Sequence, residues 1–402
     1  MPPAPSSPRC TLALEDGTVL VGGAFGAGGT RSGEVVFNTS MTGYQEILTD
    51  PSYYGQIVNM TSPQIGNYGV NPEDTEGSRP WVKGLVIKEL ARRHSNYRAT
   101  ISLEDYLAEN EIVAIQGVDT RALTKKLRVE GALRGVITTE IDDPAECVRQ
   151  ARAVPNMVGA DLVQRVAPTD TYRWTEGLGP PFAPSRPAPT AQRRVVAIDC
   201  GIKRSILRRL VDLGCEVRAM PPTSSVEQVL EDKPDGVLIG NGPGDPAAVH
   251  YAVALLGGLI GRVPIFGICL GHQLLAIALG AESFKLKFGH RGANQPVRNL
   301  TTGRVEITSQ NHGFAISTKS LGVVGAVPTH VNLNDQTLEG FVHQEMPILA
   351  VQYHPEAGPG PHDATYLFDC FATMMSTGRA PTGEEMADAQ SLMLRRRRGA
   401  SG

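Results

Sequence analysis

The fold is decided by one short stretch, Val263-Pro264-Ile265-Phe266-Gly267-Ile268-Cys269-Leu270-Gly271-His272-Gln273. Its apolar start is typical of a buried strand, and the residues after Cys269 have the pattern of a helix. Gly267 and Gly271 remove side chains on both sides of the thiol, as a tight strand-to-helix turn requires. The stretch has the form of a nucleophile elbow with cysteine in place of serine. A buried structural cysteine at a strand end is the alternative interpretation.

The composition argues against several classes of protein. The chain has 402 residues, which is long enough for about two or three domains. Its net charge of -3 is unlike that of a nucleic-acid or membrane-surface protein. No apolar run reaches transmembrane length. The 6 cysteines are scattered without a CxxC pair, so we expect no metal site in this chain and a reducing, cytoplasmic location.

The chain divides into four parts by composition. Residues 1–165 mix strand and helix patterns, and we expect them to form a mixed α/β N-terminal domain. Within it, residues 39–53 are polar and turn-rich but not of low complexity, which is typical of a functional or interface loop. Residues 166–192 are crowded with prolines and are expected to form a semi-extended linker. Residues 381–402 include an arginine run and are expected to be a disordered basic tail.

Residues 193–380 alternate between strand and helix patterns. Their apolar strands indicate a central, mostly parallel sheet flanked by helices, and hence an α/β fold for this domain. Ligands of such sheets bind beyond the carboxyl ends of the strands. The loop Asn241–Asp245 and the elbow at Cys269 both follow strands. We therefore expect the loop and the elbow to face one crevice.

A cysteine nucleophile needs a base, and His354 is the strongest candidate among the 9 histidines. Glu356 follows two positions later, with Pro355 between them. In an extended segment these two side chains share a face, so Glu356 can orient the imidazole toward the thiol. This predicts a Cys269-His354-Glu356 triad. A surface turn in which His354 and Glu356 merely pair is the alternative.

Acyl transfer also needs donors for the developing oxyanion. The elbow supplies the backbone N–H of Leu270. The Asn241–Asp245 loop can supply another from Gly242 or Gly244, because Pro243 has no N–H. A plain turn is the alternative, and a phosphate loop fits less well because no Gly-Lys-Ser/Thr follows.

Three motifs in this order resemble the class I (triad) glutamine amidotransferase family: Asn241–Asp245, Gly267–Gln273 and His354–Glu356. The resemblance covers residues 193–378. It implies that the Cys269 thiolate attacks the side-chain amide of glutamine, that ammonia leaves, and that water hydrolyses the glutamyl thioester.

The N-terminal domain is similar to a narrower family. Residues Glu34–Tyr53, and also Gln310–Phe314 and Pro359–Asp363, resemble the small subunit of carbamoyl-phosphate synthase. The resemblance implies an oxyanion hole at Gly242 and Leu270. It also implies glutamine binding by Ser52, Gly242, Gly244, Leu270, Gln273, Asn311, Gly313 and Phe314.

The resemblance also implies a partner. The chain has no P-loop and no other nucleotide fingerprint, so we expect no cofactor in it and place ATP and Mg on a large subunit. That subunit would accept ammonia and make carbamoyl phosphate from bicarbonate for pyrimidine and arginine biosynthesis. We expect neither a nucleic-acid nor a membrane partner, and a higher oligomer of heterodimers stays open. The alternatives are a glutaminase subunit of another synthetase, a non-catalytic regulatory subunit, and a Cys-His hydrolase of peptides or esters.

Overall fold

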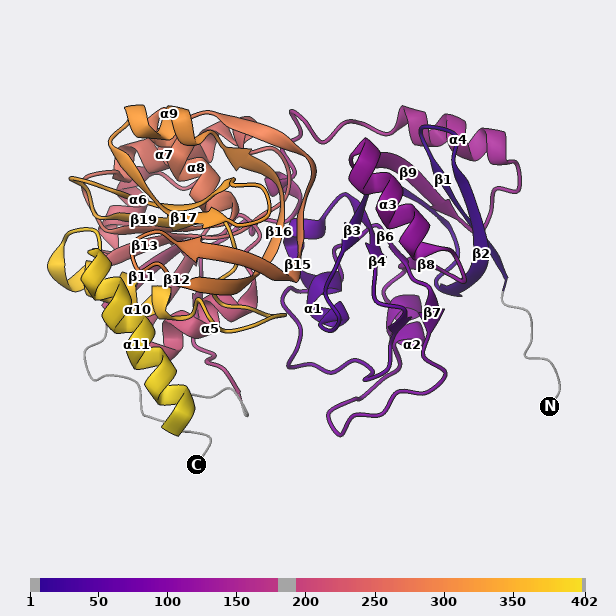
Figure 1. Ribbon diagram of the computed structural model, residues 1–402, viewed down its shortest axis with the longest axis horizontal. Helices are drawn as coiled ribbons and strands as arrows, with labels where there is room; N and C mark the ends of the chain where they lie inside the picture. Colours follow the sequence, from indigo (N-terminus) through magenta and orange to yellow (C-terminus); the bar gives the residue numbers. More distant parts are fainter. Residues whose placement is uncertain (1–7, 180–192, 400–402) are drawn as a thin grey trace. The chain divides into compact units, whose positions relative to one another are not determined.

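The computed structural model describes residues 8–179 and 193–399 (Figure 1). These residues form two compact units. The first comprises the described residues up to Ala160 together with Lys287–Gly292, and the second comprises Asp161–Leu286 and the described residues from Ala293 onward. None of the helices in the described part of the chain combines the length and the apolar character that a membrane crossing needs.

The first unit is built on a closed barrel. Its strands follow one another around the barrel in the order β1-β2-β8-β6-β4-β3-β9. Consecutive residues of a strand point to opposite faces, and the two faces feed separate apolar clusters, as at Val35 and Val36. The strands are β1 (Arg9–Leu14), β2 (Val19–Gly26), β3 (Thr30–Asn38), β4 (Gln56–Met60), β6 (Gly84–Val86), β8 (Val113–Gln116) and β9 (Leu133–Thr138).

Short helices complete this unit, and polar residues fix where most of them begin. Asp119, Ser102 and Asp143 each accept a hydrogen bond from a backbone N–H of the first turn that follows. The helices are α1 (Tyr44–Thr49), η1 (Pro51–Tyr53), α2 (Leu103–Glu109), α3 (Thr120–Glu130) and α4 (Pro144–Ala153), and β5 (Gln64–Ile65) pairs separately with β7 (Glu89–Leu90).

The second unit contains a ten-stranded sheet in the order β10-β12-β11-β13-β14-β19-β18-β17-β15-β16. The neighbours from β12 to β19 pair in parallel, which confirms the predicted parallel arrangement for the central strands, whereas β10, β18, β17 and β15 pair antiparallel on either side of them. The strands are β10 (Tyr172–Trp174), β11 (Arg193–Ile198), β12 (Cys215–Met220), β13 (Gly236–Ile239), β14 (Ile265–Ile268), β15 (Ser283–Asn299), β16 (Val305–Ile316), β17 (Ala326–Asn332), β18 (Leu338–His343) and β19 (Ile348–Val351).

Helices cover both faces of this sheet (Figure 1). On β14, Ile265 belongs to the apolar cluster of α7 (His250–Leu259) and α8 (Leu270–Leu279). The next residue, Phe266, belongs to the cluster of α5 (Arg204–Asp212) and α10 (Tyr366–Thr377). The remaining helices are η2 (Val163–Arg165), α6 (Val226–Glu231), η3 (Pro246–Ala248), α9 (Thr318–Val323) and α11 (Gly383–Gly399).

Two of the predicted boundaries need correction. The predicted linker, residues 166–192, includes strand β10, which pairs antiparallel with β12 and so belongs to the second unit. The rest of that linker from residue 180 lies outside the described residues. The second unit begins at Asp161, and the first includes Lys287–Gly292, which a single boundary at residue 165 does not anticipate.

The predicted disordered tail, residues 381–402, was wrong over most of its length. Helix α11 occupies Gly383–Gly399. Met386, Gln390 and Met393 are buried, and their spacing of four and three residues places them on one face of the helix. The two methionines of this buried face pack against the cluster that contains α10. The prediction relied on the arginine run at the end of the helix and overlooked the buried residues that precede it.

Candidate active site

The elbow is formed as the sequence predicts. Cys269 lies between β14 and α8 with φ 56° and ψ -104°, a backbone conformation that costs energy for a residue with a side chain. Its N–H donates to the Val351 carbonyl at 2.9 Å. A Cβ at Gly271 would lie 2.1 Å from the Ile239 carbonyl oxygen, and one at Gly267 would lie 2.8 Å from the Gly271 oxygen. Glycine is therefore required on both sides of the thiol.

The predicted base and its orienting acid are in contact. His354 Nδ1 lies 2.7 Å from Glu356 Oε1, and both side chains are almost fully buried. The His354 backbone N–H donates to the Ser309 carbonyl at 2.9 Å, which ties this segment to β16. His354 Nε2 forms no hydrogen bond of normal geometry to the described residues. This leaves Nε2 for the thiol or the substrate.

The electrostatics favour a charged imidazole. Burial on its own disfavours the imidazolium, but the negative charge of Glu356 outweighs burial and raises the pKa of His354 above its usual value. Burial also opposes ionisation of Glu356, yet the neighbouring Lys203 and His354 lower the pKa of that carboxyl. A protonated His354 beside an ionised Glu356 is the consequence.

Lys203 is a member of the site that the sequence interpretation missed. Its Nζ donates to Glu356 Oε1 at 2.8 Å and to the Ala357 carbonyl at 2.6 Å, and its side chain is 3% exposed. A charged amine is rarely buried unless it is paired. Lys203 follows β11, the neighbour of β13, so its place at the carboxyl end of the same sheet was the available signal.

The predicted oxyanion loop lies beside the elbow. The Gly271 N–H donates to the Gly240 carbonyl at 3.0 Å. A Cβ at Gly242 would lie 2.4 Å from the Cys200 carbonyl oxygen and 2.8 Å from Leu270 Cδ2, so only glycine allows this approach. Gly244 has φ +92°, a left-handed conformation that also favours glycine.

Asn241 fixes the start of this loop. Its Oδ1 accepts from the Lys203 backbone N–H at 3.0 Å, and its Nδ2 donates to the Gly201 carbonyl at 3.0 Å. Both groups of the buried amide thus bind the segment after β11. The loop after β13 and the loop after β11 are therefore held together at the carboxyl ends of neighbouring strands.

The predicted glutamine-binding residues of the second unit also gather at the elbow. Gln273 Nε2 donates to the Phe314 carbonyl at 2.8 Å, and Cys269 Sγ lies 3.7 Å from the Asn311 carbonyl. Gly313 lies between these two residues of β16. Backbone and side-chain groups of β16 therefore form one side of the site.

Ser52 belongs to the first unit. It lies in η1 and is buried, and its N–H donates to Asp50 Oδ1 at 2.9 Å. Its predicted role in glutamine binding stays a prediction.

A second buried polar cluster lies under α11 and was also missed. Glu306 Oε1 accepts from Tyr366 Oη at 2.8 Å and from Gln390 Nε2 at 2.5 Å, and Glu306 Oε2 accepts from Tyr353 Oη at 3.3 Å. Burial outweighs these hydrogen bonds and raises the pKa of Glu306 to about 7. Tyr353 precedes His354, so this cluster supports the backbone next to the candidate base.

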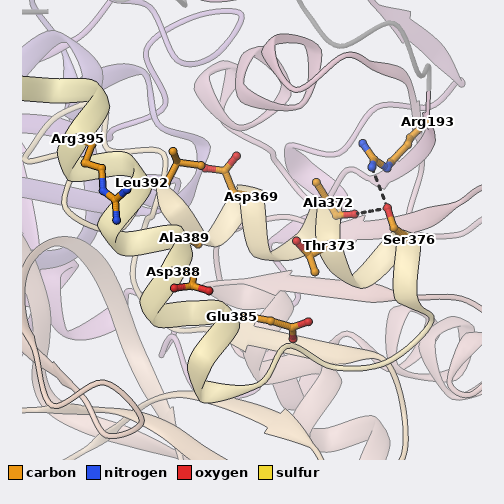
Figure 2. A pocket seen from close by; sticks show the side chains of 10 residues that line it. All are labelled: Arg193, Asp369, Ala372, Thr373, Ser376, Glu385, Asp388, Ala389, Leu392 and Arg395. Carbon is orange, nitrogen blue, oxygen red and sulfur yellow. Dashed lines mark hydrogen bonds between the residues drawn. The ribbon is translucent and has the colours of Figure 1, made fainter. Parts of the chain in front are cut away.

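A surface pocket lies between α10, α11 and the start of β11 (Figure 2). Arg193 Nη2 donates to Ser376 Oγ at 2.8 Å on one side of it, and Arg395 lies on α11. Asp369, Glu385 and Asp388 are among the other lining residues. None of the predicted site residues lines this pocket, so it is separate from the elbow.

Two family models match the chain. Residues 12–137 match the CPSase domain of the carbamoyl-phosphate synthase small chain. Residues 196–374 match the class-I glutamine amidotransferase model. The chain belongs to the carbamoyl-phosphate synthase small-chain family. Its second unit contains a class-I glutamine amidotransferase domain, and this is the glutamine-hydrolysing type of chain in that family.

Similar proteins of the same description extend over almost the whole chain. The carbamoyl phosphate synthase small chain of Syntrophotalea carbinolica is 54% identical over 378 residues, covering 93% of this chain and 100% of the relative. That of a Nostoc species is 52% identical and covers 94% of this chain and 97% of the relative. That of a Synechococcus species is 53% identical and covers 92% and 94%, respectively. The predicted family is thereby confirmed for both parts of the chain.

Proposed function

We propose that this chain hydrolyses L-glutamine through Cys269, His354 and Glu356 and supplies the ammonia to a large subunit. The Cys269 thiolate adds to the side-chain carbonyl carbon of glutamine. The tetrahedral oxyanion collapses, the C–N bond breaks, and His354 gives its proton to the leaving nitrogen, which departs as ammonia. The products of this half are a glutamyl thioester and a neutral His354.

Water completes the reaction. It attacks the thioester carbon while neutral His354 takes one of its protons, and the thiolate leaves as the side-chain carboxyl group forms, which then releases its remaining proton to water to give glutamate. Each proton that His354 releases in the first half is thus replaced in the second. Glu356 holds Nδ1 at 2.7 Å, so Nε2 is the nitrogen that exchanges protons in both halves.

We place the oxyanion against the backbone N–H groups of Leu270 and Gly242. The close approach that glycine allows at Gly242 supports this assignment. Donors of this kind typically lower the barrier by about 3 kcal/mol each. Ser52, Gly244, Gln273, Asn311, Gly313 and Phe314 are proposed to bind the rest of glutamine.

The ammonia is proposed to pass to a large subunit that carries ATP and Mg. That subunit would form carbamoyl phosphate from bicarbonate for pyrimidine and arginine biosynthesis. Transfer within a complex has a physical advantage, because ammonia released into water would be protonated and diluted. The relatives' shared description as small chains supports such a partner.

One observation carries the proposal: the His354–Glu356 pair and the Cys269 elbow lie at the ends of the adjacent parallel strands β19 and β14. Its test is Cys269→Ser, assayed with the large subunit. Glutamine-dependent carbamoyl phosphate synthesis should be lost, while synthesis from added ammonia should continue. Cys215→Ser is the matched control, because Cys215 is a buried thiol of the same unit on β12.

Two outcomes would contradict the role of Cys269. Loss of both activities in a complex that still assembles would mean that Cys269 is not specific to glutamine hydrolysis. Retention of glutamine-dependent synthesis would mean that another group performs the chemistry.

A further inference from the structure

We infer that Gln352 is a positioning residue that fixes the side-chain amide of Gln273, so that Gln273 presents its carbonyl oxygen to the α-ammonium group of glutamine. The inference rests on the proposed glutamine site. It adds a residue to which that proposal gives no role.

Gln352 comes directly after β19 and is completely buried. Its N–H donates to the Glu339 carbonyl at 2.9 Å, so hydrogen bonding to β18 continues one residue beyond β19. The preceding residue, Val351, belongs to the apolar cluster of α10. The Gln352 side chain lies on the opposite face, where its Oε1 is 2.9 Å from Gln273 Nε2 of α8. Gln273 is in the first turn of α8.

Both hydrogens of the Gln273 amide nitrogen have acceptors. One points to the Phe314 carbonyl at 2.8 Å, and the other points to Gln352 Oε1 at 2.9 Å. The Phe314 carbonyl can only accept, so the nitrogen rather than the oxygen of Gln273 must face it. None of the hydrogen bonds among the described residues ends on Gln273 Oε1. The orientation of the amide is therefore set, and its oxygen is the atom left for the substrate.

His272, the residue before Gln273, is a buried neutral histidine of the same helix. Its ring is completely buried and packs against Phe341, with ring centroids 5.1 Å apart. Burial lowers the pKa of His272 to about 3, against a smaller opposing effect of the Gln352 side chain, so the ring is neutral. A neutral imidazole has one nitrogen that can accept a hydrogen bond. Neither the ring nitrogens of His272 nor the Gln352 amide nitrogen forms a hydrogen bond of normal geometry to the described residues, so the bond from Gln273 Nε2 to Gln352 Oε1 sets which end of the Gln352 amide faces Gln273.

The chemistry of the substrate explains why this orientation matters. An ammonium group has three donors and no acceptor, so a carbonyl oxygen attracts it and an NH₂ group does not. A Gln273 amide turned by half a rotation would present the wrong group. Two acceptors on the nitrogen prevent that rotation more firmly than Phe314 alone could. Gln352 thereby selects a substrate that has an α-ammonium group.

The test compares two substrates that differ only in that group. We compare the hydrolysis of L-glutamine with that of glutaramate, which lacks the α-ammonium group. Both are assayed with the complete complex of small and large subunits, in the parent and in Gln352→Leu. The variant removes the acceptor at similar side-chain volume. The KM for glutamine should rise about fivefold to tenfold with kcat little changed, as expected for one lost hydrogen bond. The kinetic constants for glutaramate should stay within about twofold, because that substrate does not use the contact.

Two further variants separate positioning from damage. Gln352→Glu keeps an acceptor oxygen and should retain the KM of the parent for glutamine. Gln352→Leu added to Gln273→Leu should raise the KM no further, because the amide that Gln352 orients is already absent.

Each failure has a separate signature. Equal losses for glutamine and glutaramate in Gln352→Leu would overturn the positioning role, and so would an unchanged KM for glutamine. If the parent complex hydrolyses neither substrate, the proposed function fails, and the inference fails with it. If both substrates are hydrolysed and Gln352→Leu leaves the ratio of their kcat/KM values as in the parent, the inference is wrong and the proposed function stands.

Discussion

Glu306→Gln should remove a large part of the pH dependence of stability in the second unit. Glu306 is buried under α11, and its pKa is raised from 4.5 to about 7, chiefly by burial. The folded unit therefore holds this proton more tightly than the unfolded chain does. The resulting stabilisation is complete below about pH 4.5 and is lost as the pH rises through about 7.

The size of the effect follows from the two pKa values. Their difference, at about 1.4 kcal/mol for each pH unit, corresponds to about 3 kcal/mol in the free energy of unfolding. The amide that the substitution introduces cannot ionise in this range and keeps the shape of the carboxyl group. The stability of the variant relative to the parent should therefore rise by about 3 kcal/mol between about pH 4.5 and pH 8.

Tryptophan fluorescence can report this measurement, because each unit contains one tryptophan. The 2 tryptophans are Trp81 in the first unit and Trp174 on β10 in the second. In a Trp81→Phe background, urea unfolding followed by fluorescence reports the second unit alone. The same pH slope in Glu306→Gln and its parent would refute the reasoning. Glu345→Gln, at an exposed position of the same unit, is the control that should leave the slope unchanged.

Two further predictions concern the elbow. Gly271→Ala should destabilise the second unit by about 3 kcal/mol or abolish its folding, because the new Cβ would lie 2.1 Å from the Ile239 carbonyl oxygen. In the same urea assay, Gly257→Ala on the exposed face of α7 should be neutral or stabilising by up to about 1 kcal/mol, and equal effects would contradict the steric argument. Iodoacetamide should label Cys269 before the other thiols, and glutamine should protect Cys269, as measured by peptide mass spectrometry. The reason is that burial raises the pKa of the other five thiols, for example to about 12 at Cys10 and about 11 at Cys215. Uniform labelling would contradict a thiolate at Cys269.

The parts of the site that the sequence predicted are those with a local pattern. The elbow needs glycine at fixed positions around Cys269, and His354 and Glu356 share a face because they are two residues apart in an extended segment. Sheet pairing between β14 and β19 then brings these two patterns together. The same local logic located the parallel sheet, because its strands are apolar on both faces.

The parts that were missed depend on contacts between distant residues. Lys203 is 153 positions from Glu356, and nothing near Lys203 in the sequence indicates a buried partner. Glu306 meets Gln390 across 84 positions, and the charged end of α11 hid the buried face of that helix. Gln352 has its role only because α8 places Gln273 opposite it. Such contacts follow from the order of strands in the sheet, which no single segment specifies.

The buried pair of Lys203 and Glu356 also affects the net charge of the site before and after the proposed reaction. With the thiolate that the proposed reaction requires at Cys269, the charges of Cys269, His354, Glu356 and Lys203 would alternate in sign and sum to zero. Glutamine is a zwitterion with no net charge, so it would enter an electrically neutral crevice. Glutamate carries one more negative charge and would leave its new carboxylate facing the regenerated thiolate. In the proposed reaction, Lys203 would therefore offset the charge of Glu356 while glutamine binds, and the negative charge gained on hydrolysis would favour release of glutamate.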